Sequence, residues 1–134
     1  MAVPREVAFD YLGDPRVRPQ WQSSLRSVAL PDRDARPGVG MSWRETTMVG
    51  VRPQMEIIEF DRPRVWAERG TWRGVEATLV LSFEERSEGC RVVADGEIVG
   101  RSVYAAAAAV AGRLAGLAIS GDLRKAKRIL ERRV

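Results

Sequence analysis

Apolar and polar positions alternate with a period of two across the middle of this chain, between residues 25 and 99. The clearest stretch is residues 75–84, where Leu79, Leu81 and Phe83 alternate with polar side chains. Turns rich in glycine, proline and aspartate divide the pattern into six predicted strands. These strands cover residues 25–30, 41–49, 55–60, 65–72, 75–84 and 91–99. Because short turns join them in order, we expect an antiparallel meander.

Helical spacing of apolar residues flanks the predicted strands on both sides. Residues 4–12 form a short helix that begins at Pro4, and residues 16–22 form a second one that carries Trp21. One long helix follows the strands, from about residue 102 to residue 134, and alanine and glycine dominate its first half. At 134 residues the chain fits one domain. We therefore expect an α+β domain in which a curved antiparallel sheet wraps around the C-terminal helix.

The period of two also predicts which strand residues face that helix, with Leu79, Leu81 and Phe83 taken as inward. A shift of one residue would reverse any strand. The other residues predicted to point inward are Trp43, Glu45, Met55, Ile57, Glu59, Trp66, Glu68, Gly70, Trp72, Val92, Ala94 and Ile98.

Large aromatic rings on the sheet would lie opposite small residues on the helix. Such a combination predicts an apolar cavity between sheet and helix, although close packing with a residual pocket is the alternative. The residues predicted to line a ligand site are Trp21, Trp43, Met55, Ile57, Trp66, Trp72, Leu79, Leu81, Phe83, Tyr104 and Ala108.

Glu45 and Glu68 are the candidates for chemistry. A carboxylate in an apolar interior has a raised pKa, which suits a general acid or base for proton abstraction or cyclisation. Alternatively, each carboxylate pairs with a nearby arginine such as Arg44 or Arg69, or lies at a solvated mouth. Tyr104 could donate a hydrogen bond to a ligand oxygen, or simply pack against the sheet.

Composition narrows the remaining possibilities. The chain has no histidine and one cysteine, Cys90, which argues against a catalytic triad and a His- or Cys-based metal site. No glycine motif for a phosphate or dinucleotide is present, so we expect no cofactor and no metal. No signal peptide is visible, and residues 103–119 are short for a membrane span and interrupted by Arg113, so we expect a cytoplasmic protein.

The formal net charge is +4, and the one basic cluster lies at the end of the long helix. Its members are Arg124, Lys125, Lys127, Arg128, Arg132 and Arg133. Cations there complement the helix dipole, and a surface for a partner is the alternative. Nucleic-acid binding is not expected, because the aromatic residues fall on the predicted interior.

Several segments resemble the START-related helix-grip superfamily (SRPBCC), and within it the polyketide cyclase/dehydrase family of small bacterial proteins. The resemblance rests on residues 3–12, Asp14, Trp21, residues 37–40 with 43–45, residues 60–64 and residues 122–130. It covers nearly the whole chain and is specific for fold rather than for activity. It implies a ligand such as a polyketide, a lipid or an aromatic metabolite.

In one respect the chain departs from this family. Family members usually begin with a long strand before the segment that matches Val3 and Pro4, and only three residues precede Pro4. We expect either that the start is truncated, or that a partner chain in a homodimer covers the exposed edge. The expected function is binding of a small hydrophobic molecule, with a cyclase, dehydratase or isomerase that uses a cavity carboxylate as the alternative.

Overall fold

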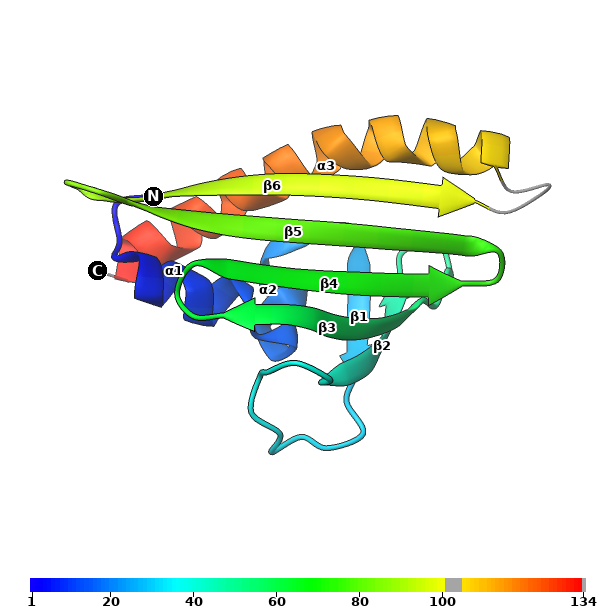
Figure 1. Cartoon of the computed structure of the whole chain (residues 1–134), viewed down its shortest axis with the longest axis horizontal. Helices are drawn as coiled ribbons and strands as arrows, with labels where there is room; N and C mark the ends of the chain where they lie inside the picture. The colour runs from blue at the N-terminus through cyan, green and yellow to red at the C-terminus, as the bar shows by residue number, and fades with distance from the viewer. Residues whose placement is uncertain (101–104, 134) are drawn as a thin grey trace.

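The computed structural model describes the backbone of residues 1–100 and 105–133, and the side chains of residues 1–100 and 118–133. Helices and strands follow one another as the sequence predicts (Figure 1). The helical elements are α1 (Arg5–Leu12), the 3₁₀ turn η1 (Pro15–Val17), α2 (Arg18–Trp21) and α3 (Ala105–Arg133). The strands are β1 (Leu25–Ala29), β2 (Ser42–Thr47), β3 (Gln54–Asp61), β4 (Val65–Trp72), β5 (Val75–Arg86) and β6 (Gly89–Gly100).

The segment predicted as one helix over residues 16–22 is a 3₁₀ turn followed by a separate helical turn. The Asp14 side chain accepts a hydrogen bond from the backbone N–H of Arg16 at 3.0 Å and so starts the 3₁₀ turn. Pro19 has no N–H to donate, and such a residue is tolerated only in the first turn of a helix. The chain therefore begins a new helical turn at Arg18.

The six strands form one antiparallel sheet in the order β1-β2-β3-β4-β5-β6. The predicted registers are confirmed on β4, β5 and β6, where Trp66 lies opposite Leu81, and Leu81 opposite Ala94. On β3 the prediction for Glu59 is wrong. A bulge between Ile57 and Glu59 shifts the register, so that Phe60 lies opposite Trp66 and Glu59 is exposed. One extra residue in a strand reverses the facing of all that follow it.

The face of the sheet that bears these aromatic residues, here called the inner face, is covered at one end by the helices. Phe9 of α1 packs against Phe60 and Phe83, with ring centroids 5.1 Å apart in each pair. Ala126 and Leu130 of α3 are buried in the same cluster. Figure 1 shows α3 running alongside β6, with its C-terminal end close to the short N-terminal helices.

Asp122 fixes α3 to the start of the sheet. Its buried carboxylate accepts hydrogen bonds from the backbone N–H and the hydroxyl of Ser23, at 3.1 and 2.8 Å. Ser23 lies between α2 and β1, so this contact joins segments that are 99 residues apart in the chain. The position of α3 over the sheet is thus set by a polar contact as well as by apolar packing.

The outer edge of β6 carries a backbone bridge to the first residue of the chain. Met1 N–H₃⁺ donates to the carbonyl of Cys90 at 2.8 Å, and the N–H of Cys90 donates to the carbonyl of Met1 at 2.9 Å. This reciprocal pair is the beginning of an antiparallel ladder. Gly89 allows the approach, because it has a φ of +147° and a Cβ there would lie 2.1 Å from the Met1 carbonyl oxygen.

No helix within the described part of the chain is both long and apolar enough to cross a lipid bilayer.

Candidate ligand-binding site

Both candidate carboxylates meet the same arginine in the interior. Arg18 Nη1 donates to Glu45 Oε2 at 2.7 Å and to Glu68 Oε2 at 2.5 Å, and Arg18 Nη2 donates to Glu68 Oε1 at 2.8 Å. The Arg18 side chain is 1% exposed, and both carboxylates are buried. Glu45 Oε2 also accepts a hydrogen bond from the indole N–H of Trp43 at 2.9 Å. Helix α2 and strands β2 and β4 therefore meet in one buried ionic cluster.

Three tryptophans surround this cluster. The Arg18 guanidinium carbon lies 5.8 Å from the ring centroid of Trp21, 5.6 Å from that of Trp43 and 5.3 Å from that of Trp66. All three distances are within the range of cation–π attraction. The three rings were predicted to line a cavity, and instead they enclose the Arg18 guanidinium. The indole N–H groups of Trp21 and Trp66 are buried and have no acceptor among the described residues.

The two arginines proposed from sequence as partners for these carboxylates are the wrong ones. Arg69 lies on the outer face and pairs with Glu56 at 3.0 Å, while Arg44 donates to the carbonyl of Arg52 at 3.1 Å. Each is next to an inward residue on its own strand, and adjacent residues of a strand point to opposite faces.

Arg18 was not among the predicted site residues, although its spacing from Trp21 indicates that it points into the interior. Residues three apart on a helical turn lie on the same side. Since Trp21 was expected in the interior, Arg18 belonged there too. A buried arginine requires carboxylate partners, and Glu45 and Glu68 were already predicted to point inward.

The cluster has two carboxyl groups and one guanidinium. Burial raises the pKa of Glu68, Arg18 opposes that effect, and the nearby charge of Glu45 adds to it, so the pKa of Glu68 lies above its ordinary value. Burial alone would lower the pKa of Arg18, but the charges of Glu68 and Glu45 outweigh burial and raise it. Arg18 is therefore permanently charged, and the site has one carboxylate more than it needs for neutrality.

Side-chain size divides the inner face of the sheet into two ends. At the filled end, next to α1 and α2, the inner residues are large and fully buried. They include Trp43, Met55, Ile57, Trp66, Leu81 and Phe83. At the other end, called here the open end, the residues opposite one another on β4, β5 and β6 are mostly small or half-buried. They are Gly70, Trp72, Ala77, Leu79, Gly96 and Ile98.

Glu68 lies at the boundary between these two ends, because it is directly opposite Leu79. Among the predicted site residues, Trp72 and Leu79 belong to the open end, and the other described ones belong to the filled end. Tyr104 lies outside the described residues. Ala108 is within α3, but its side chain is outside the described part.

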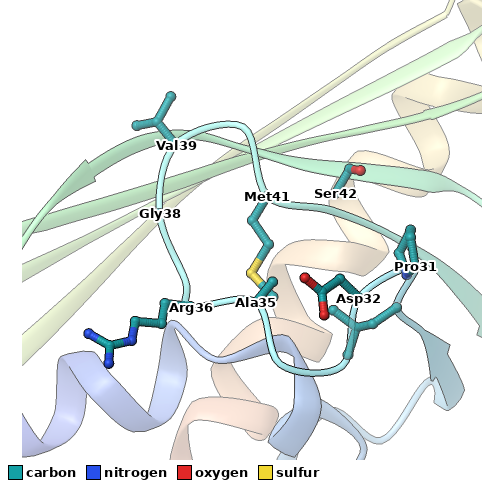
Figure 2. A pocket seen from close by; sticks show the side chains of 9 residues that line it. Pro31, Asp32, Ala35, Arg36, Gly38, Val39, Met41 and Ser42 are labelled. Carbon is teal, nitrogen blue, oxygen red and sulfur yellow. The ribbon is translucent and has the colours of Figure 1, made fainter.

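A pocket of about 230 Å³ lies within the loop that joins β1 to β2 (Figure 2). It is lined by Leu30, Pro31, Asp32, Ala35, Arg36, Gly38, Val39, Met41 and Ser42. Arg16 braces the loop by donating to the carbonyls of Arg33 and Ala35. None of the predicted ligand-binding residues lines this pocket.

A groove of about 300 Å³ lies between the start of β6 and the C-terminal half of α3. Its walls are formed by Met1, Cys90, Arg91, Val92, Leu123, Arg124 and Lys127. Cys90 is a free, buried thiol whose pKa is raised by burial. A thiol with a raised pKa is a poor nucleophile, which agrees with a packing role for Cys90. Within the described part of the chain, no group of three His, Cys, Asp or Glu side chains could hold a metal ion.

The open antiparallel sheet gripped by a long C-terminal helix, with an apolar inner face, defines a helix-grip domain, the fold that the sequence predicts. The profile of the family described as polyketide cyclase / dehydrase and lipid transport matches residues 1–134. The chain belongs to that family. No curated protein sequence matches the chain.

Solved structures share the fold at low sequence identity. Protein MLL2253 from Mesorhizobium loti is 14% identical with a TM-score of 0.74, and the match covers 98% of this chain and 92% of that one. DR_A0006 from Deinococcus radiodurans is 18% identical with a TM-score of 0.67, over 100% and 93% of the two chains. Ara h 8.0201 is 11% identical with a TM-score of 0.59, over 93% and 91%.

Proposed function

We propose that this protein binds a small hydrophobic molecule at the open end of the inner face, between β4, β5, β6 and the first half of α3. The class of ligand is one that a family of polyketide cyclases and lipid transporters would take: a polyketide, a lipid or an aromatic metabolite. Binding sites of this kind are concave and mostly apolar, with few polar groups.

The observation that carries the proposal is the change in side-chain size along the inner face. Trp66 and Leu81 fill the space at one end, whereas Ala77 and Gly96 at the other end add little side-chain volume. The Met55 side chain covers Gly70, where a Cβ would lie 2.7 Å from its sulfur. In the sequence of α3 opposite that end, nine of the twelve residues 105–116 are alanine or glycine, and the others are Val110, Arg113 and Leu114. Small residues on both elements leave volume that their own side chains cannot fill, and half-buried apolar residues gain from a ligand that covers them.

Trp72 and Leu79 supply the larger apolar surfaces of this proposed site. Trp72 is half-buried, and the Arg73 guanidinium carbon lies 4.7 Å from its ring centroid. An aromatic ring of this kind offers a flat surface for an apolar ligand. Glu68 stands at the inner limit of the site, with both of its oxygens held by Arg18.

The geometry does not favour the alternative in which Glu45 or Glu68 acts as a catalytic acid or base. A catalytic base needs an oxygen within hydrogen-bond reach of the substrate. Both oxygens of Glu68 accept from Arg18. Glu45 Oε2 accepts from Arg18 and from Trp43, and the Glu45 side chain is only 4% exposed. We therefore assign the ionic cluster to the support of the filled end, next to the site rather than within it.

Titration with an environment-sensitive apolar dye tests this function, with the wild type compared with Glu45→Gln and Glu68→Gln. We expect saturable binding by all three proteins, with dissociation constants within about threefold of one another, because neither carboxylate touches the dye. The absence of saturable binding by the wild type would refute the proposed function. If the dye binds the wild type but neither variant, the ligand site includes the ionic cluster.

A further inference from the structure

The last third of α3 carries a continuous face of cations. Arg124, Arg128 and Arg132 are spaced by four residues and are exposed, so they form one stripe along the helix. Lys127 and Lys125 lie on either side of that stripe. The opposite side of the same turns is buried, at Asp122, Ala126 and Leu130, which follow the same spacing. The five cations are called the cationic face below.

Structural stability does not account for the cationic face. Cations complement the helix dipole only within the last turn, and Arg124 lies nine residues before Arg133, which is about 14 Å along the axis. Like charges spaced by four residues repel one another and weaken a helix. Among the described residues, no carboxylate forms an ion pair with any of the five.

Two charged residues next to the cationic face, by contrast, do have partners within the fold. Arg133, on another side of the helix, stacks on Tyr11 at 5.2 Å from its ring centroid and donates to Gln20. Glu131 accepts a hydrogen bond from the backbone N–H of Ala2 at 2.8 Å. These two residues hold the end of α3 against the N-terminal segment. Among the residues that the structure describes, the five members of the cationic face have no such structural partner, which leaves their charges for an external anion.

The groove beside this face adds an apolar component. Met1, Val92 and Leu123 contribute its apolar walls, while Arg124 and Lys127 of the cationic face contribute its charged rim. Arg91 of β6 adds a third cation to the rim and is only weakly paired, with Glu84 at 3.9 Å. A charged rim around apolar walls matches a ligand with an anionic head and an apolar chain.

We propose that the cationic face of α3 and the adjoining groove dock this protein on an anionic lipid bilayer. Basic residues near such a surface are attracted to it individually, and an apolar groove can accept an acyl chain. A nucleic acid would favour exposed aromatic rings among the cations, and no described aromatic residue belongs to the cationic face. This docking goes beyond the proposed function, because it does not require the open end of the inner face.

Cosedimentation with lipid vesicles tests the docking. The wild-type protein is mixed with vesicles of phosphatidylcholine alone, or of phosphatidylcholine with phosphatidylglycerol, at low and high salt. We expect binding to the anionic vesicles that weakens with salt, and little binding to the neutral ones. Equal binding to both kinds of vesicle, or binding to neither, would overturn the proposal, as would binding to duplex DNA that is tighter than binding to the anionic vesicles.

The variant Arg124→Gln/Arg128→Gln/Arg132→Gln removes the stripe. We expect about 100-fold weaker binding to anionic vesicles, because each cation contributes roughly a factor of five. The matched control, Arg26→Gln/Arg36→Gln/Arg52→Gln, removes the same charge from exposed arginines of β1 and the loops, and its binding should stay within about threefold to fivefold of the wild type. An equal loss in both variants would attribute binding to net charge alone and overturn the proposal.

A third variant separates docking from folding. Arg124→Lys/Arg128→Lys/Arg132→Lys keeps the charge and should retain binding within about threefold to fivefold. Circular dichroism should show the same helix content in all variants, because the three arginines are exposed and form no ion pair with a described carboxylate. If the lysine variant folds but does not bind, a surface attracted by charge is the wrong description of this face.

Discussion

Arg18 donates two hydrogen bonds to Glu68, of 2.5 and 2.8 Å, although the two residues are 50 positions apart in the sequence. The same guanidinium also donates to Glu45, so that one buried cation serves two buried carboxylates. This cluster occupies the filled end of the inner face, and the proposed ligand site is the apolar surface beyond Glu68.

The surplus of one carboxylate predicts a non-additive response to mutation. Glu45→Gln and Glu68→Gln should each change the free energy of unfolding by less than about 2 kcal/mol, because Arg18 keeps one charged partner. The double variant leaves a buried cation with no counter-charge, which costs about 3–5 kcal/mol. Urea unfolding at neutral pH measures all three, with Glu84→Gln on the surface as the control. A double variant equal to the sum of two small effects would contradict this account.

Glu68 also predicts a dependence of stability on pH. Because its pKa is raised above the ordinary value of 4.5, the folded protein keeps this proton at pH values where the unfolded chain has released it. The free energy of unfolding attributable to Glu68 therefore falls as pH rises from about 4.5 through the raised pKa. Unfolding measured from pH 4 to pH 8 should show this fall in the wild type relative to Glu68→Gln. A difference that grows in the opposite direction would mean that Arg18 dominates and the pKa is lowered.

The positions of the tryptophans predict which of them reports ligand binding. Trp72 lies at the open end, whereas Trp21, Trp43 and Trp66 are fully buried around Arg18. The change in fluorescence on binding an apolar ligand should therefore disappear in Trp72→Phe and persist in the control Trp43→Phe. If the control loses the signal and Trp72→Phe keeps it, the ligand enters the ionic cluster instead.

The outer edge of β6 predicts how copies of the chain interact. The Met1–Cys90 bridge leaves residues 92–100 for pairing, and the backbone groups of Ala94 and Gly96 point outward there because those of Cys90 do. The longest two-fold pairing of two such edges places Asp95 of each copy opposite Glu97 of the other. Like charges directly opposite are destabilising, so we expect no dimer through this edge.

Sedimentation velocity over a range of concentrations measures whether the chain dimerises. Asp95→Lys replaces both repulsive pairs with attractive ones and should promote association. A wild-type dimer that Gly96→Pro dissociates would contradict the expectation, since proline removes one outward N–H from this edge.

Alternation along the strands was enough to predict the meander, its strand order and most of its registers. The alternation of Leu79, Leu81 and Phe83 identified the inner face of β5. Antiparallel pairing then placed Ala94 and Trp66 on the same face. The error at Glu59 came from a bulge. A bulge depends on local twist and pairing between strands, and the residues at 57–59 carry no glycine or proline to signal it.

The candidate site was harder to predict, because it depends on distances between segments. Glu45 and Glu68 were correctly predicted to point inward, but the partner that neutralises them lies on a helical turn remote in sequence. Periodicity gives the face of each residue and not the neighbour across the interior. The size of the space next to the tryptophans was therefore overestimated, because Arg18 occupies it.

The central claim is that the ligand lies on the inner face at the open end, and two substitutions on one strand test it most directly. Ala77→Phe fills the proposed space, while its neighbour Thr78→Phe adds the same side chain to the opposite face of β5. Titration with an apolar dye should give a dissociation constant at least about tenfold higher for Ala77→Phe, a loss of about 1.4 kcal/mol, and an unchanged constant for Thr78→Phe. Unaltered binding by a folded Ala77→Phe protein would contradict the claim.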